Sequence, residues 1–227
     1  DSVYPVQESE TLAIRDALGR ILASPITSDL DVPGHTNSAM DGYAVRGTDL
    51  PSDATQRLKV IGTAFAGRPF ANSVAKHECV RIMTGAVMPT ACDTVIMQEH
   101  VQLEADEIII DDQQQAGQNV RLVGEDIAKG DSVFQPGRRL SPADIGLLAS
   151  LGIAKVSVIR KLKVAFFSTG DELTSIGQPL ASGQIYDSNR YTLWSMLSEI
   201  GVEIIDLGVV RDAPELVEQA FKDAAAQ

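Results

Sequence analysis

Cysteine and histidine are scarce in this sequence. Its 227 residues contain two cysteines, Cys79 and Cys92, and three histidines, His35, His77 and His100. This set excludes a disulfide framework and a four-cysteine zinc site, and the scattered histidines do not complete one. We therefore predict that both thiols are reduced and structural.

Positive charge is also scarce. Lys and Arg number 19 against 31 Asp and Glu, which gives a formal net charge of −12. A surface that neutralises nucleic-acid phosphates or an anionic membrane has to be basic, so this balance disfavours both partners. No apolar run approaches the roughly 18 residues of a membrane span, and the first residues do not resemble a secretory signal. We expect a cytoplasmic protein.

Several familiar catalytic patterns are missing too. The sequence has no P-loop, GxGxxG fingerprint, nucleophile elbow or Ser/His/Asp triad spacing. What is present is an ordinary globular composition, with 44% hydrophobic and 22% charged residues. At roughly 100 to 200 residues per domain, the length fits one large domain or two to three small ones.

Short β-type runs separated by turn formers dominate residues 38–119 and predict a small β-barrel or sandwich. Before them, residues 17–23 predict a helix that stops before Pro25, and residues 27–37 predict an extended crossing. The β-type runs are 58–61, 79–83, 94–97, 101–103 and 107–110.

A capped helix is predicted over residues 141–152. Ser141 is the expected N-cap, Pro142 occupies the first helical position, Asp144 completes a capping box and Gly152 ends the helix. A strand pattern at 155–159 follows.

Residues 162–227 alternate between strand and helix patterns. An apolar strand at 162–167 precedes a helix that stops at Gly201, and a strand at 202–207 precedes a helix that begins at Asp212. This order is typical of a parallel sheet covered by helices, yet two strands fall short of the roughly four to six of a stable open sheet. We therefore expect the first half of a domain, and a chain that is a fragment.

The loop after the 162–167 strand is the first candidate site. It contains Ser168, Thr169, Gly170, Asp171 and Glu172. Ligands of open α/β sheets bind beyond the carboxyl ends of the strands, and adjacent carboxylates suit Mg²⁺ that is shared with substrate phosphates. The alternative interpretation is an exposed acidic turn.

A second candidate site lies where the next helix starts. Asp187, Ser188 and Asn189 are placed where free backbone N–H groups favour an anion. Helix capping alone also explains Asp187 or Ser188.

Three further segments mix small residues with one or two polar ones, a composition that suits either a close approach of the backbone to a ligand or tight turns. They are NSAMDGYAV at 37–45, RIMTGAVMP at 81–89 and GQNVRLVGED at 117–126. Together with ALGRILASPITSDLDVPG at 17–34, STGDEL at 168–173 and QIYDSN at 184–189, they closely resemble the molybdopterin molybdenumtransferases, the family of MoeA and of the E domain of gephyrin.

The resemblance implies a mixed α/β, multi-domain homodimer. Residues 1–36 and 120–161 would form a discontinuous, stalk-like domain, and residues 37–119 an inserted β-rich domain. Residues 162–227 would begin a three-layer αβα domain, similar to MogA, that binds molybdopterin.

The resemblance also implies a reaction. Molybdate would be inserted into adenylylated molybdopterin in a step that depends on Mg²⁺ and releases AMP, and this fragment alone would be inactive. Asp171 and Glu172, with Asp187 close by, would organise Mg²⁺ or water, whereas the partner subunit would contribute residues equivalent to Asp41, Thr84 and Asp126. Arg121 is a candidate anion contact, although Leu122 and Val123 stand where many relatives place further arginines.

The same resemblance implies that molybdopterin would be bound by Ser168, Thr169, Gly170, Asp187, Ser188 and Asn189. It also implies a MogA-like molybdopterin adenylyltransferase as a partner. Two alternatives stay open. One is a scaffold that binds peptides, as gephyrin does, and the other is a paralogue that binds a pterin or nucleotide without molybdenum transfer.

Overall fold

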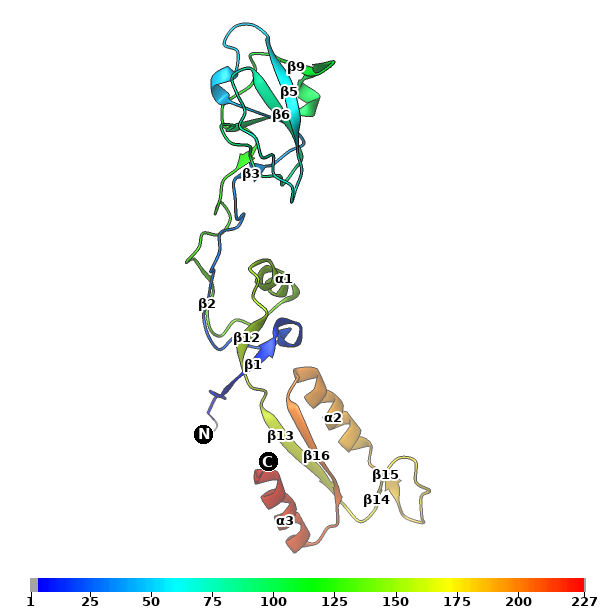
Figure 1. Cartoon of the computed structure of the whole chain (residues 1–227). Coiled ribbons are helices and arrows are strands. Elements are labelled where there is room, and N and C mark those ends of the chain that lie inside the picture. Colours follow the sequence, from blue (N-terminus) through cyan, green and yellow to red (C-terminus); the bar gives the residue numbers. More distant parts are fainter. Residues whose placement is uncertain (1–3, 227) are drawn as a thin grey trace. The chain divides into compact units, whose positions relative to one another are not determined.

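The computed structural model describes residues 4–226 and divides the chain into two compact units. Unit 1 comprises Asp1–Ala23 and Lys155–Gln227, and unit 2 comprises Ser24–Ala154 (Figure 1). The three domain boundaries inferred from the sequence stay predictions, because this division into units is coarser. Among the described residues, no helix has both the length and the apolar character needed to cross a membrane.

Unit 2 contains a six-stranded sheet in the order β7-β4-β6-β5-β9-β8. Neighbouring strands are antiparallel except for the parallel pair β5 and β6. Each of the five β-type runs inferred from the sequence contributes a strand to this sheet, although Met83 and Val101 lie just outside β6 and β8, so the predicted β-rich character of this region is confirmed. The strands are β4 (Gly42–Val45), β5 (Gln56–Ala64), β6 (Glu78–Ile82), β7 (Thr94–Met97), β8 (Gln102–Glu104) and β9 (Glu107–Ile110).

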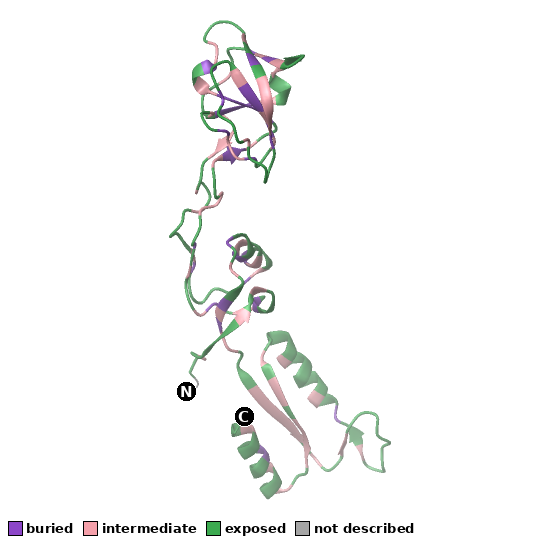
Figure 2. Ribbon diagram, in the orientation of Figure 1, coloured by how far each residue is buried: buried purple, intermediate pink, exposed green. Residues whose placement is uncertain are grey.

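Both faces of this sheet bury apolar side chains, because successive residues of a strand point to opposite faces. One cluster gathers around Tyr43, Leu58 and Cys79, and the other around Val80 and Ile82. Figure 2 shows buried residues concentrated in these strands. Short 3-10 helices at Gly47–Asp49 (η2) and Gln98–His100 (η3) flank the sheet.

Two antiparallel strand pairs connect the segment that precedes this sheet in the sequence with the segment that follows it. β2 (Ile26–Thr27) pairs with β11 (Ser132–Phe134), and β3 (Asn37–Ser38) pairs with β10 (Val120–Arg121). Unit 2 also contains α1 (Pro142–Ser150). The predicted cap is confirmed, because the Ser141 side chain accepts a hydrogen bond from the Asp144 N–H and the Asp144 carboxylate accepts one from the Ser141 N–H.

In unit 1, β1 (Ser9–Ala13) pairs antiparallel with β12 (Lys155–Ile159). The predicted helix over 17–23 is wrong. A 3-10 helix, η1, covers only Ile14–Ala17, and Leu22 instead forms an antiparallel bridge with Val158. The backbone of Ala23 donates to the Ser157 carbonyl at 2.9 Å, so pairing with a distant strand overrides the local helical pattern.

The rest of unit 1 is an αβα arrangement of two strands and two helices. The parallel strands β13 (Lys163–Thr169) and β16 (Glu203–Val210) lie side by side between α2 (Ser188–Ile200) and α3 (Pro214–Ala225) (Figure 1). β14 (Leu173–Thr174) pairs with β15 (Ile185–Tyr186). The predicted mixed α/β fold class is confirmed, whereas the strands of this region are only half-buried (Figure 2).

Two local predictions for this region are wrong. β13 continues through Ser168 and Thr169, so the turn begins at Gly170. The N-cap of α3 is Ala213 without a side-chain hydrogen bond, and not Asp212. By contrast, Gly201 ends α2 in the left-handed conformation, as its position after an apolar helical face predicts.

Candidate functional site

Asp41 and Thr84 meet where β4 begins and β6 ends. Gly42 pairs with Ile82 across these strands, which brings the residues just outside each strand together. The backbone N–H and the hydroxyl of Thr84 both donate to Oδ1 of Asp41, each at 2.7 Å. The structure thus joins two residues that are 43 positions apart in the sequence.

The pKa of Asp41 lies below its ordinary value. The backbone hydrogen bond from Thr84 is the main cause, the Thr84 hydroxyl adds to it, and the positive charge of Arg81 contributes further. Asp41 is exposed and presents an ionised carboxylate. Its Oδ1 is occupied by Thr84, so Oδ2 is the oxygen that faces a ligand, a cation or a water molecule most freely.

Arg121 and Asp126 also meet, next to the same sheet. The Nη2 group of Arg121 lies 2.5 Å from Oδ1 of Asp126, and its Nε lies 3.4 Å from Oε1 of Glu125. Hydrogen bonding to Asp126 raises the pKa of Arg121. An anion that binds Arg121 therefore has to compete with two carboxylates of this chain. Leu122 and Val123 are exposed beside them.

In unit 1, the turn after β13 holds Glu172 against the backbone. Gly170 has φ +147°, and a Cβ placed there would lie 2.6 Å from Oε2 of Glu172. The φ value favours glycine at this position, and a larger residue would displace the exposed Glu172 carboxylate. Asp171 and Glu172 are exposed, while Ser168 is half-buried at the end of the strand.

Asp187 is the N-cap of α2. Its Oδ1 accepts from the Arg190 N–H at 3.1 Å, so the capping interpretation is confirmed. Asp187 is only 3% exposed, and its buried Oδ2 has no hydrogen-bond partner among the described residues. Ser188 and Asn189 form the exposed first turn of the helix.

Arg190 and Asp206 complete this end of α2, and sequence reasoning did not find them. The Nε of Arg190 donates to both carboxylate oxygens of Asp206, at 2.8 and 3.0 Å, and this raises the pKa of Arg190. The backbone of Gly208 also donates to Asp206. No sequence signal links these residues, because their helix and strand become neighbours only in the folded unit.

Both parts of the chain match family models. Residues 1–152 match the model described as "MoeA N-terminal region (domain I and II)", and residues 165–227 match the one described as "Probable molybdopterin binding domain". The chain belongs to the MoeA family. The resemblance inferred from the motifs is therefore confirmed.

Relatives of this MoeA-family chain are similar over nearly its whole length. It is 48% identical over 225 residues to the molybdopterin molybdenumtransferase of Haemophilus influenzae, covering 99% of the chain and 55% of the relative. The molybdopterin molybdenumtransferase of Nostoc sp. is 39% identical over 223 residues, with 97% and 51% covered. The chain thus spans about half the length of these relatives.

Solved structures agree. A crystal structure described as a molybdopterin biosynthesis moea protein from Pyrococcus horikosii superimposes with a TM-score of 0.84 at 39% identity. The match covers 97% of this chain and 57% of that one. The fold of the MoeA-family chain is therefore that of known MoeA structures.

The donor groups for Mg²⁺ in this MoeA-family chain are few. Across residues 4–226, no group of three or more His, Cys, Asp or Glu side chains is arranged to hold a metal ion. The adjacent carboxylates Asp171 and Glu172 fit the other way in which proteins bind Mg²⁺, with one or two carboxylates while water and substrate phosphate fill the remaining positions. They do not form a cage made of protein ligands alone.

Proposed function

We propose that this chain contributes to a molybdopterin molybdenumtransferase, which inserts molybdate into adenylylated molybdopterin and releases AMP. The observation that carries the proposal is the 48% identity to a relative of that name over 99% of the chain. The sequence match extends through the Asp41–Thr84 pair and the Glu172 turn, so it includes the candidate site and not only the scaffold.

The proposed chemistry requires cleavage of a phosphoanhydride bond by water. Such a step depends on positioned water and neutralised phosphate charge more than on a protein nucleophile. The ionised carboxylate of Asp41 accepts a hydrogen bond from water or a substrate hydroxyl, and Thr84 fixes its orientation. Asp171 and Glu172 would hold Mg²⁺, which supplies charge neutralisation when bound.

Other residues bind and orient the substrate in this proposal. Arg121 contacts an anionic oxygen and exchanges its pairing with Asp126 when it does so. Molybdopterin contacts the end of β13 at Ser168 and Thr169, the following Gly170, and the start of α2 at Asp187, Ser188 and Asn189. Free backbone N–H groups at a helix start favour the phosphate of such a ligand.

The assembly and setting belong to the same proposal. We propose a cytoplasmic homodimer in which Asp41, Thr84 and Asp126 of one copy complete the site around Glu172 of the other. A MogA-like adenylyltransferase supplies the adenylylated substrate. A full active site is expected to need the length of the relatives, because this chain covers about half of them.

The direct test supplies adenylylated molybdopterin, molybdate and Mg²⁺ to the enzyme in its full-length form and measures AMP release. Asp41→Asn and Glu172→Gln are expected to lower the rate at least a hundredfold, with Asp53→Asn, an exposed acid of unit 2, as the matched control. Wild-type rates in both site variants would overturn the residue roles. Substrate binding without any AMP release would instead favour a pterin-binding paralogue, and peptide binding alone a scaffold.

A further inference from the structure

A pocket in unit 2 lies beside the Asp41–Thr84 pair and is not used by the roles above. We call it the Arg81 pocket; its walls include Tyr43, Phe65, Arg81, Leu103 and Asp106, and its volume is about 460 Å³. That volume falls in the range of roughly 300 to 1,000 Å³ that small-molecule sites occupy. Phe65 and Leu103 are exposed at 44% and 58%, so the pocket presents apolar surface to solvent.

The guanidinium of Arg81 donates hydrogen bonds to uncharged side chains. Its Nη1 donates to the Tyr43 hydroxyl at 3.1 Å, and its Nη2 donates to the side-chain oxygen of Gln98. The guanidinium lies 5.2 Å from the centroid of the Tyr43 ring. Its buried Nε has no acceptor among the described residues. In a chain with net charge −12, this arginine is fixed in place without a carboxylate that neutralises it directly.

A second arginine, Arg68, contacts one of the aromatic wall residues, although Arg68 itself does not line the pocket. Its guanidinium is 5.7 Å from the centroid of the Phe65 ring, and the backbones of these two residues pair in a tight turn. The two aromatic residues of the wall, Tyr43 and Phe65, therefore each face an arginine. Arginine recognises phosphate and also stacks on flat ring systems, which makes this combination suitable for an anionic aromatic ligand.

The pocket continues toward the candidate site. Met83, which also lines it, precedes Thr84, and Tyr43 follows Asp41 by two residues. The charge of Arg81 contributes to the lowered pKa of Asp41. Asp106 also lines the pocket, and its backbone carbonyl accepts from the Val60 N–H at 2.8 Å, which fixes the backbone of this wall.

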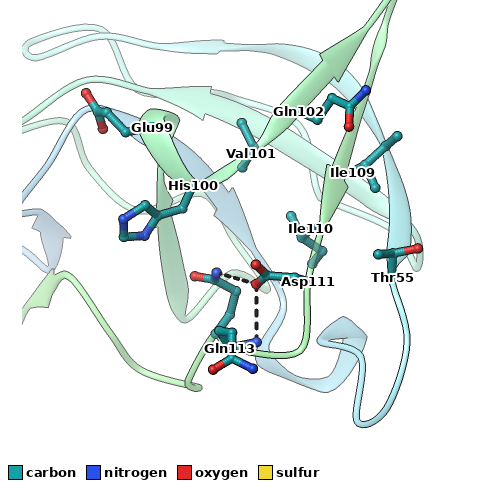
Figure 3. A pocket seen from close by; sticks show the side chains of 10 residues that line it. Thr55, Glu99, His100, Val101, Gln102, Ile109, Ile110, Asp111 and Gln113 are labelled. Atoms are coloured by element: carbon teal, nitrogen blue, oxygen red, sulfur yellow. Dashed lines mark hydrogen bonds between the residues drawn. The ribbon is translucent and has the colours of Figure 1, made fainter.

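A different pocket of unit 2 lacks these features. Its walls carry Glu99, His100 and Asp111 but no arginine (Figure 3). Asp111 is a carboxylate whose Oδ1 accepts from the side chain of Gln114 at 2.8 Å and from the N–H of Gln113 at 3.2 Å, so both acidic side chains of this wall would repel an anion. This second cavity does not suit an anion.

We propose that the Arg81 pocket binds a planar heteroaromatic ring that carries a phosphate. The ring lies between the apolar walls, and the phosphate faces Arg81. An adenylate and a phosphorylated pterin share this chemistry. Naming either as the substrate of this chain rests on the proposed transferase function, whereas the ligand class rests on the pocket alone.

Calorimetric titration of the chain with AMP, adenosine and neopterin monophosphate tests the proposal. At least one of the two anions is expected to bind saturably, and the stronger one identifies the source of the ring. Arg81→Gln should weaken that anion about tenfold, because a charge-assisted hydrogen bond is lost. Adenosine, which carries no phosphate, should bind more weakly than AMP and respond little to Arg81→Gln.

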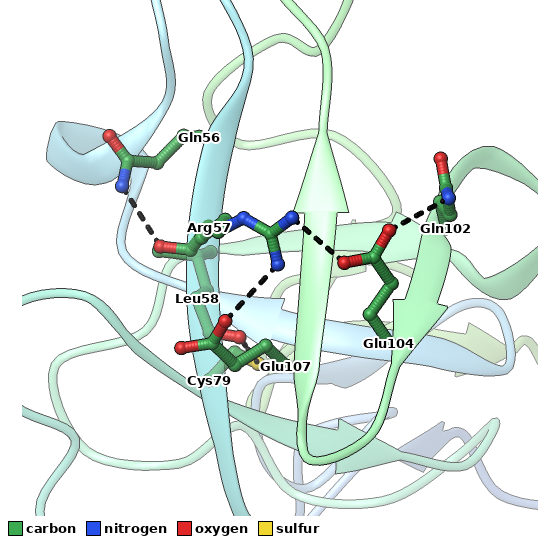
Figure 4. A network of polar contacts seen from close by, with 7 residues as sticks. All are labelled: Gln56, Arg57, Leu58, Cys79, Gln102, Glu104 and Glu107. Carbon is green, nitrogen blue, oxygen red and sulfur yellow. Dashed lines mark hydrogen bonds and ion pairs between the residues drawn. The ribbon is translucent and has the colours of Figure 1, made fainter.

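Two further variants test whether the anion binds in the Arg81 pocket. Leu103→Trp fills the cavity from its exposed rim, leaves Arg81 unchanged and should also weaken binding. Arg57→Gln is the matched control. Arg57 pairs with Glu104 and Glu107 (Figure 4), and because it precedes the buried Leu58 in the strand, it lies on the face of the sheet opposite to Leu58 and to Arg81. Circular dichroism of each variant should match that of the wild type, which checks that the variants are folded.

The proposal is overturned if neither anion binds, or if Arg81→Gln and Leu103→Trp bind the anion as the wild type does. The AMP-release assay separates this outcome from the proposed function. Binding that depends on Arg81 without any AMP release by the wild-type enzyme would remove the function and leave the pocket. Normal AMP release together with binding that is independent of Arg81 would support the proposed function and overturn the role of the Arg81 pocket.

Discussion

At the scale of single residues, the hydroxyl of Thr84 donates a hydrogen bond to the Asp41 carboxylate. Replacing Thr84 with Val removes the hydroxyl but keeps the backbone hydrogen bond to Asp41, so the pKa of Asp41 is expected to rise partway toward its ordinary value. Thr84→Ser retains a hydroxyl and should leave the pKa near that of the wild type. Carbon-detected NMR titration of the Asp41 carboxylate measures both; an unchanged pKa in Thr84→Val would contradict the assigned contact.

Gly170 makes a second residue-scale prediction. An alanine there has to adopt a φ of +147°, which L-residues rarely do, so Gly170→Ala is expected to destabilise unit 1 by roughly 1–3 kcal/mol and to displace the exposed Glu172 carboxylate. Gly177→Ala is the control, since Gly177 has φ +86° and nothing within 4 Å of the added Cβ. Thermal unfolding should show the larger loss for Gly170→Ala, and equal losses would contradict a special backbone cost at Gly170.

Sequence alone recovers part of this site. The motif resemblance selected Asp41 and Thr84, and the structure joins them. It did not select Arg81, Gln98 or Arg190, because their roles depend on cross-strand and helix-to-strand neighbours that no local pattern records. Arg121 illustrates the same limit, since its pairing with Asp126 becomes visible only when the turn between them is folded.

At the scale of elements, local signals succeed where local hydrogen bonds decide the structure. The capping box of α1 is an example, because Ser141 and Asp144 satisfy each other within one turn. Residues 17–23 fail for the opposite reason. Their apolar spacing fits a helix, yet Leu22 pairs with Val158, and this long-range contact decides the outcome.

The α1 cap also makes a pH prediction. Hydrogen bonding from Arg138 and from Ser141 lowers the pKa of Asp144 from 3.8 to about 2. A lowered pKa means that the ionised carboxylate stabilises the fold above pH 3.8, and that this contribution is lost as the pH falls toward 2. Asp144→Asn should therefore cost roughly 1–2 kcal/mol at pH 7 and almost nothing near pH 2.

Urea unfolding of the wild type and Asp144→Asn at several pH values measures this difference. Asp53→Asn removes an exposed acid whose carboxylate accepts a hydrogen bond from Ser52, and it controls for the change in net charge. A difference between wild type and Asp144→Asn that stays constant from pH 7 to pH 2 would exclude the ion pair and the cap as its source.

At the scale of the whole molecule, the two units carry separate probes. The single tryptophan, Trp194, lies in α2 of unit 1, whereas both cysteines lie in unit 2. Burial raises the pKa of the Cys79 thiol to about 12, so this thiol should react slowly with disulfide reagents until unit 2 unfolds. Tryptophan fluorescence and thiol labelling thus report on different parts of one chain.

Because each unit is compact in its own contacts, we expect the units to unfold separately. Leu58→Ala leaves a cavity next to Cys79 in the core of unit 2 and should cost roughly 2–5 kcal/mol there. The midpoint of thiol labelling in urea should fall, while the midpoint of Trp194 fluorescence should stay within error. Phe167→Ala, which removes the ring contact with Phe221 in unit 1, should have the converse effect. If both midpoints shift together in both variants, the two units form one cooperative structure.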